Sequence, residues 1–207
     1  RIPAHPIALS LIVEFKKLGG MGIAAPSANR FGKVSPTSAA AVMEELTPNL
    51  DYSLDQILDG GPSHIGIEST IINCTGDSPE ILRLGFITKE MIEESTARKV
   101  INSASNIRVS GSMESHYAPN AKVYLNMIPQ EGFGFIALSN VPTPPGCIRL
   151  ASPINLEEYA RELYAALRLA DFKGIDQLVA ITPQGDGLAA AISDRLKKSA
   201  NRAGENE

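Results

Sequence analysis

Two polar side chains, Ser27 and Asn29, directly follow a short apolar run over residues 22–26, which is typical of a buried strand ending at a proline. A hydroxyl and an amide at the carboxyl end of a strand suit ribose, carboxylate or phosphate oxygens. Ser35 lies six residues beyond Asn29 and precedes Pro36, which predicts an N-cap with proline in the first helical turn. Free N–H groups there favour an anion. An ordinary turn and cap would leave the same pattern.

A glycine-rich segment over residues 60–70, GGPSHIGIEST, is the next candidate for binding. Its glycines let the backbone approach a ligand closely, and Ser69 and Thr70 enter the strand predicted over residues 68–74. The segment lacks the Gly-Lys-Ser/Thr of a phosphate-binding P-loop and the dinucleotide fingerprint. A glycine-rich hairpin connection is the alternative interpretation.

Three further side chains have types that could contact a ligand. Arg83 lies at the end of the strand predicted over residues 80–84, where it is either a phosphate clamp or the partner of a buried ion pair. A surface arginine on an edge strand would look the same. His116 and Tyr117 are adjacent in a polar stretch that needs neither residue as a spacer. They either close over a ligand or pin the stretch in place.

Composition excludes several classes of protein. The 207 residues are 43% hydrophobic and carry a formal charge of −4, which permits a packed core and argues against a general polyanion binder. Two distant cysteines and three scattered histidines lack the spacing of a metal site. No apolar run approaches a membrane span and no export signal is visible, so we expect a cytoplasmic protein without a membrane partner.

The pattern of elements predicts two α/β domains of a fold that alternates strands and helices. Helices are predicted over residues 4–18, 37–46, 88–99, 156–171 and 187–199, and strands over 22–26, 55–59, 68–74, 80–84, 122–126, 133–138, 147–150 and 177–182. A stretch over 102–121 is rich in Ser, Asn and Gly, which is typical of a linker. We therefore predict a first domain over 1–108, a linker over 109–121 and a second domain over 122–207.

The order of these motifs resembles the L-threonylcarbamoyladenylate synthase family in its long, two-domain form. The resemblance covers essentially the whole chain, through the segments APSANRFGKVSPT, GGPSHIGIESTIIN, ILRLGFIT and SHYAP and the tail YAALRLADFKGIDQLVAITPQGDGLAAAISDRLKK. It implies an incomplete YrdC-like twisted mixed sheet with helices, followed by a small Rossmann-like parallel α/β domain.

The resemblance also implies an activity and a site. Enzymes of this family combine L-threonine, bicarbonate and ATP into threonylcarbamoyl-AMP and release pyrophosphate. The resemblance places Arg1, Ser27 and Ser69 at L-threonine. It assigns ATP to the remaining candidates, which are Ala25, Asn29, Ser35, Arg83, His116 and Tyr117. No catalytic residue and no metal ligand is assigned, since Mg²⁺ arrives with ATP and no tightly bound cofactor is implied.

The product would pass to a tRNA-modifying transferase that acts on the adenosine beside the anticodon, with RNA as a further possible partner. The chain begins Arg1-Ile2-Pro3 without the family's N-terminal phosphate-binding segment, and Glu114 stands where many members have tyrosine. We therefore expect the 207 residues alone to be an inactive fragment.

Two alternative functions are an RNA-binding, translation-linked module and a carbamoyl-transfer domain on the same fold. The content of 5% aromatic residues and the negative net charge disfavour the RNA-binding module. The tail disfavours the carbamoyl-transfer domain.

Overall fold

The computed structural model describes residues 2–102, 107–111 and 116–201. The chain forms two compact units, and each is described here by itself. The first comprises residues 1–30 and 35–63, and the second comprises residues 31–34 and 64–207. The predicted boundaries at 108 and 122 both fall inside the second unit, and they stay predictions.

The first unit contains helix α1 (Pro6–Lys17), helix α2 (Ala39–Leu46) and the 3-10 helix η1 (Thr47–Asn49). The helix predicted over 4–18 is confirmed in α1. The hydroxyl of Ser38 caps α2 by accepting from the backbone N–H of Ala41 at 3.3 Å, so the prediction of Ser35 as the N-cap is wrong. Ser38 competes better because its extended backbone directly precedes the first helical residue.

Two strands predicted in the first unit do not form. Residues 22–26 and 55–59 have no strand hydrogen bonding among the described residues of this unit. A strand needs a neighbour for its backbone N–H and C=O groups, and a short apolar run does not create one. The prediction of a strand over residues 22–26 that ends at Pro26 is therefore wrong.

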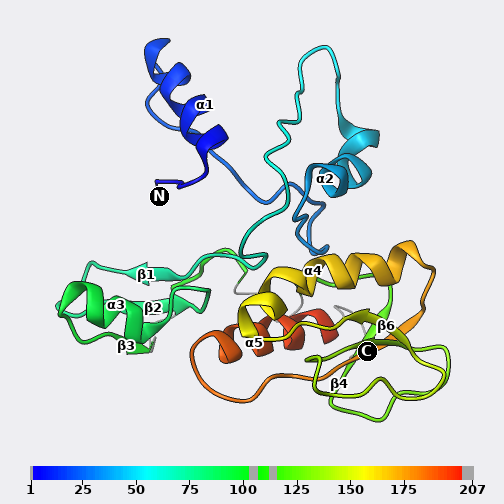
Figure 1. Ribbon diagram of the computed structural model, residues 1–207. Coiled ribbons are helices and arrows are strands. Elements are labelled where there is room, and N and C mark those ends of the chain that lie inside the picture. Colours follow the sequence, from blue (N-terminus) through cyan, green and yellow to red (C-terminus); the bar gives the residue numbers. More distant parts are fainter. Residues whose placement is uncertain (1, 103–106, 112–115, 202–207) are drawn as a thin grey trace. The chain divides into compact units, whose positions relative to one another are not determined.

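The second unit contains a small mixed sheet, formed by β1 (Ile71–Asn73), β2 (Glu80–Arg83) and β3 (Ile101–Asn102) in that spatial order. β1 and β2 are antiparallel, whereas β2 and β3 are parallel. Helix α3 (Lys89–Thr96) connects them, with Thr88 as its N-cap (Figure 1). Ile81, Ile92 and Val100 form the core between this sheet and α3.

The second sheet of the same unit is fully parallel. It contains β4 (Lys122–Leu125), β5 (Gly134–Ile136), β6 (Ile148–Ala151) and β7 (Gln177–Ala180), in the order β4-β7-β5-β6. Helices α4 (Leu156–Phe172) and α5 (Leu188–Ala200) pack on it. We call this sheet with its two helices the C-terminal layer. The predicted α/β class, with one mixed and one parallel sheet, is confirmed.

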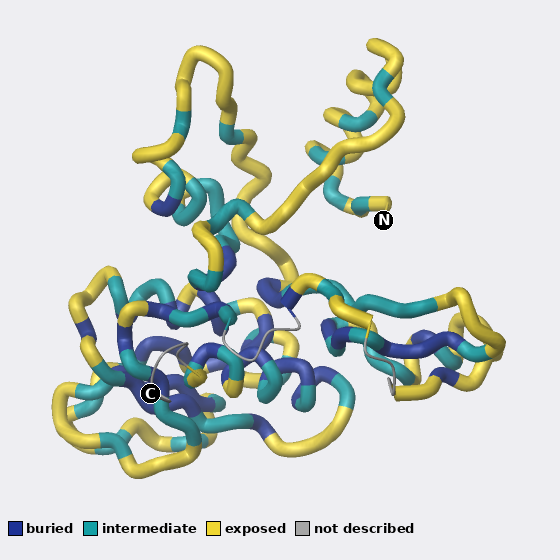
Figure 2. The backbone as a smooth tube through the Cα atoms, turned by 180° about the vertical axis from the view of Figure 1, so that it is seen from behind, coloured by how far each residue is buried: buried dark blue, intermediate teal, exposed yellow. Residues whose placement is uncertain are grey.

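Most of the buried residues lie in the C-terminal layer, while α1 has no buried residue (Figure 2). Asn155 caps α4, because its side-chain oxygen accepts from the N–H of Glu158 at 2.8 Å. Glu158 accepts in return from the N–H of Ile154, one residue before the cap. None of the helices in the described ranges combines the length and hydrophobicity that a membrane span requires.

Candidate functional site

Arg83 and Ser69 contact each other at the junction of β1 and β2. Arg83 ends β2 and is paired with Ile71 of β1, which brings its side chain back to the segment before β1. Its Nε and Nη2 donate to the carbonyl oxygen of Ser69 at 3.1 and 2.9 Å, and Nη2 lies 3.5 Å from the Ser69 hydroxyl. These bonds fix the guanidinium plane beside Ser69.

The same guanidinium also holds the predicted linker. Nη1 of Arg83 donates to the carbonyl oxygen of Ser110 at 2.8 Å. The next residue, Gly111, has a φ of +75°, and a Cβ there would clash with the Tyr117 hydroxyl. Lys198 of α5 donates to the carbonyl oxygen of Gly111 at 2.7 Å. Ser110 and Gly111 are therefore held between Arg83 and α5.

Tyr117 is almost fully buried, with 1% of its surface exposed, and adopts a left-handed backbone with a φ of 60°. That conformation is strained for an aromatic residue. Its ring stacks on Tyr164 of α4, with centroids 5.3 Å apart, and lies 5.6 Å from the guanidinium carbon of Arg195. Burial, with a smaller contribution from the Glu68 carboxylate, raises the pKa of Tyr117 to about 12, so its hydroxyl stays protonated.

His116 packs edge-on against Tyr117, with ring centroids 4.1 Å apart. Its backbone N–H donates to the carbonyl oxygen of Lys198 at 3.3 Å. Burial lowers the pKa of His116 below 6.5; the Glu68 carboxylate opposes this, and nearby cations led by Lys198 add to it. The ring is therefore neutral at pH 7. Its buried Nδ1 has no hydrogen-bond partner among the residues that the structure describes.

Glu68, directly before Ser69, is part of a buried polar network that the sequence analysis did not identify. Its Oε2 accepts from the Tyr164 hydroxyl at 2.8 Å and from Nε of Arg195 at 3.0 Å. Burial alone would raise the pKa of Glu68, but Arg195 and the hydrogen bond from Tyr164 hold it below its usual 4.5. The sequence feature that could have indicated this network is Arg195. It occurs at helical spacing on the buried face of α5, together with Leu188, Ile192 and Ser199.

The structure thus brings Ser69, Arg83, His116 and Tyr117 into one cluster around Gly111. Four other predicted residues, Ala25, Ser27, Asn29 and Ser35, belong to the first unit. There the backbone N–H of Asn29 donates to the carbonyl oxygen of Ser27 at 2.9 Å. The side-chain amide of Asn29 donates to the backbone carbonyl oxygen of Arg30 at 2.8 Å. Arg1 lies outside the described residues. That Ser27, Asn29 and Ser35 contact the same substrates as Ser69 and Arg83 stays a prediction.

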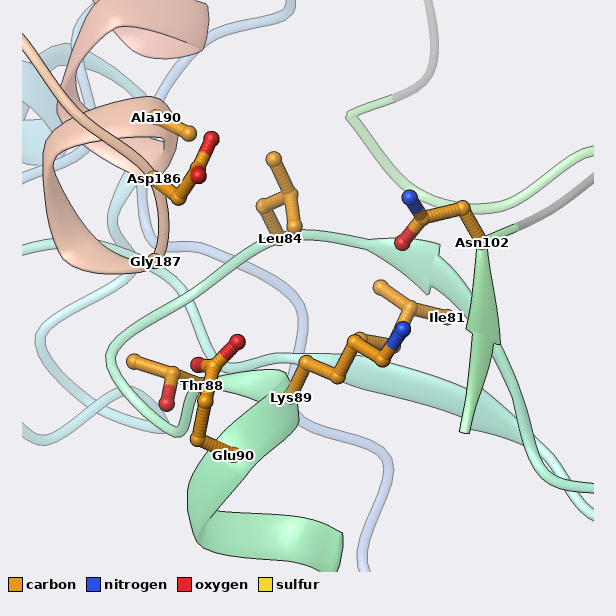
Figure 3. Close-up of a pocket in the computed structure, with 9 residues that line it drawn as sticks. All are labelled: Ile81, Leu84, Thr88, Lys89, Glu90, Asn102, Asp186, Gly187 and Ala190. Atoms are coloured by element: carbon orange, nitrogen blue, oxygen red, sulfur yellow. The ribbon is translucent and has the colours of Figure 1, made fainter. Parts of the chain in front are cut away.

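A cavity of about 500 Å³ lies elsewhere in the second unit (Figure 3). Ile81 and Leu84 give it apolar walls, and Lys89, Glu90 and Asp186 line it from the starts of α3 and α5. The residues that line it include none of the predicted contacts. Within the described ranges, no group of three His, Cys, Asp or Glu side chains could hold a metal ion.

Comparison with known proteins relates the whole chain to one family. A family model described as threonylcarbamoyl-AMP synthase, C-terminal domain, matches residues 87–201, and one described as telomere recombination matches residues 1–85. Threonylcarbamoyl-AMP synthase of Bacillus subtilis is 36% identical over 97% of this chain, and that of Pyrococcus abyssi is 34% identical over 96%. The chain spans 62% of the length of each relative.

A solved structure shows the same fold. The crystal structure of P. abyssi Sua5 complexed with L-threonine matches 97% of this chain and 63% of its own, with a TM-score of 0.77 and 33% sequence identity.

Proposed function

Because the chain belongs to the threonylcarbamoyl-AMP synthase family, we propose that it makes threonylcarbamoyl-AMP from L-threonine, bicarbonate and ATP. The observation that supports this proposal is the cluster in which Arg83 bonds both Ser69 and Ser110. It joins three segments that the sequence analysis selected separately: the glycine-rich segment, the end of β2, and the linker. Related proteins bear the name of this activity, and one was solved with L-threonine bound.

The proposed reaction requires alignment more than covalent catalysis. The threonine amine first forms a carbamate with bicarbonate and releases water, and a carbamate oxygen then attacks the α-phosphorus of ATP. The bond from that phosphorus to the bridging oxygen breaks, and pyrophosphate leaves with Mg²⁺ that arrived on ATP. The protein's task is to position two substrates and to neutralise developing charge.

The residues of the cluster suit those two tasks. We assign Ser69 to L-threonine, with Ser27 and Arg1 as its further contacts. Arg83 supplies positive charge toward the nucleotide from a guanidinium whose plane is already fixed, so little reorganisation is needed when charge develops.

The other proposed contacts with ATP are those that the sequence analysis assigned to it. They are Ala25, Asn29, Ser35, His116 and Tyr117. A neutral imidazole and a protonated phenol can donate hydrogen bonds to a nucleotide without adding charge. Closure of the linker over the nucleotide also stays a prediction.

The product is a reactive mixed anhydride whose threonylcarbamoyl group can be transferred to a nucleophile with release of AMP. We propose that a tRNA-modifying transferase in the cytoplasm transfers it to the adenosine beside the anticodon, with RNA as a further partner. The match of residues 87–201 to the synthase's C-terminal domain favours this function over a carbamoyl-transfer domain.

Pyrophosphate release tests the proposal in the protein expressed from its complete coding sequence. We expect release that requires L-threonine, bicarbonate and ATP–Mg²⁺ together and that stops when any one is omitted. Release that continues without L-threonine would identify an ATPase-like activity instead and would contradict the proposal.

A further inference from the structure

Arg195 of α5 is a cation with 0% of its surface exposed. Its Nε donates to Glu68 Oε2 at 3.0 Å, its Nη2 donates to the carbonyl oxygen of Leu84 at 2.7 Å, and its Nη1 donates to Asp194 Oδ2 at 2.6 Å. A buried ion pair is often no more stabilising than apolar side chains of the same volume. Stability alone therefore does not explain an arginine at this position.

The segments that Arg195 holds are those that carry the proposed substrate contacts. Glu68 directly precedes Ser69, and Leu84 directly follows Arg83. Beside them, a Cβ on Gly85 would lie 2.6 Å from the carbonyl carbon of Ser69, so the two backbones are already in close contact. Arg195 is bonded to the residue before Ser69, through the Glu68 carboxylate, and to the residue after Arg83, through the Leu84 carbonyl oxygen. One side chain therefore holds the backbones of both segments.

The linker is held at the same place. The guanidinium carbon of Arg195 lies 5.6 Å from the centre of the Tyr117 ring, within the range of a cation–π contact. Tyr164 stacks on the Tyr117 ring, and the Tyr164 hydroxyl donates a hydrogen bond to the Glu68 carboxylate. Arg195 thus contacts the glycine-rich segment, the end of β2 and the linker with one side chain.

We propose that Arg195 is a positioning residue for the synthase reaction, contributed by the C-terminal layer. Through Glu68 and the Leu84 carbonyl it fixes Ser69 and Arg83, and through Tyr117 it fixes the linker beside them. The proposal rests on the proposed function, because Ser69 and Arg83 are substrate contacts only in that reaction. Arg195 acts through these neighbours and is not itself assigned to a reacting atom.

Three variants of the protein expressed from its complete coding sequence test this role. Arg195→Met keeps the volume but leaves the Glu68 carboxylate buried without its cation. Glu68→Gln combined with Arg195→Met removes both charges and so removes that defect. Arg149→Met is the matched control, because Arg149 also lies in the C-terminal layer and donates to the carbonyl oxygens of Ala137 and Leu138.

The measurements are the melting temperature and steady-state kinetics of threonylcarbamoyl-AMP formation. We expect Arg195→Met to lower the melting temperature and the double variant to restore it. The KM for L-threonine should stay raised in the double variant, by about tenfold or more, since misalignment persists without the guanidinium. Arg149→Met should lower the melting temperature and leave that KM unchanged.

A double variant with the wild-type KM and the wild-type kcat would overturn the positioning role and leave a structural ion pair. A wild-type protein that makes no threonylcarbamoyl-AMP would overturn the proposed function itself, so the two failures are distinguishable. If Arg195→Met does not fold, the double variant still distinguishes a positioning role from a structural ion pair, because it leaves neither Glu68 nor Arg195 as an unpaired buried charge.

Discussion

Arg83 donates hydrogen bonds to two carbonyl oxygens and carries the charge that we assign to the nucleotide. We predict that Arg83→Ala weakens ATP binding by about 1.5–3 kcal/mol, which is typical of a hydrogen bond to a charged group. Calorimetric titration with ATP–Mg²⁺ measures this loss, with Arg149→Ala as the control. An unchanged dissociation constant for Arg83→Ala would limit Arg83 to bracing Ser69 and Ser110.

Glu68 makes the stability of the cluster depend on pH. Its pKa in the folded protein is held below 4.5 by Arg195 and Tyr164 against the opposing effect of burial. A carboxyl with a lowered folded pKa stabilises the fold above its unfolded pKa, and this contribution is lost as the pH falls through the folded value. The contribution should therefore be complete at pH 7 and should be lost as the pH falls below 4.5 and through the folded pKa of Glu68.

Urea unfolding of the wild type and Glu68→Gln between pH 3 and pH 8 measures that contribution. We expect the variant to be less stable by about 3 kcal/mol at pH 7, since it leaves Arg195 buried without its anion. The difference in the free energy of unfolding between wild type and variant should become smaller toward pH 3. A difference that is constant from pH 3 to pH 8 would mean that the pKa of Glu68 is the same in the folded and unfolded protein.

At the scale of the element, Gly111 has a left-handed backbone conformation that is unfavourable for other residues. Its φ is +75°, and an added Cβ would clash with the Tyr117 hydroxyl and lie 3.4 Å from Nη1 of Arg83. Gly132 has a φ of +83° with open space around it, which makes Gly132→Ala a matched control. We predict a loss of about 1–2 kcal/mol for the control and an additional loss of about 1–3 kcal/mol for Gly111→Ala.

Chemical denaturation of the two glycine variants compares these losses directly. Equal losses would show that only backbone strain matters and that the backbone at Gly111 can move away from Tyr117. A larger loss for Gly111→Ala supports a backbone at Gly111 that is packed against both Arg83 and Tyr117.

The cap of α4 provides an independent prediction for the C-terminal layer. Asn155 accepts from the N–H of Glu158 at 2.8 Å, so Asn155→Ala should lower the free energy of unfolding by about 1 kcal/mol. Among the described residues, the structure records no contact between this cap and the cluster around Gly111. We therefore expect the KM for L-threonine to stay the same. A raised KM would mean that α4 transmits strain to Tyr164.

Elements with a strong pattern could be predicted from the sequence, and those that depend on distant partners could not. The helices of the C-terminal layer were predictable from caps and apolar stripes, and its strands from apolar runs between turns. Residues 22–26 look like a strand, but a strand forms only beside another. β3 is only two residues long, and no sequence period can indicate it.

The candidate site was predictable in part for a similar reason. Ser69 and Arg83 occur at a strand start and a strand end, so residue type and position suffice to select them. Arg195 and Tyr164 occur on helices whose stripes suggest ordinary core packing. Only the fold shows that both reach Glu68, more than 90 residues away in the sequence.

At the scale of the whole molecule, charge on the triphosphate is the limiting requirement of the proposed reaction. In this chain, Arg83 is the one described cation that we assign to the nucleotide, and the chain spans 62% of the Bacillus subtilis relative. We predict that the 207 residues alone release pyrophosphate far more slowly than that full-length relative under the same conditions. Comparable rates would contradict this prediction and would show that the cations of this chain are sufficient.

In the proposed reaction, the protein expressed from its complete coding sequence joins a carbamate of L-threonine to the α-phosphate of ATP. Mass spectrometry after incubation with ¹³C-bicarbonate, L-threonine and ATP–Mg²⁺ identifies the product of this reaction. We predict threonylcarbamoyl-AMP that carries the label in its carbamoyl carbon, with one pyrophosphate released for each product. Pyrophosphate release with only unlabelled AMP or threonyl-AMP as the nucleotide product would contradict the claim.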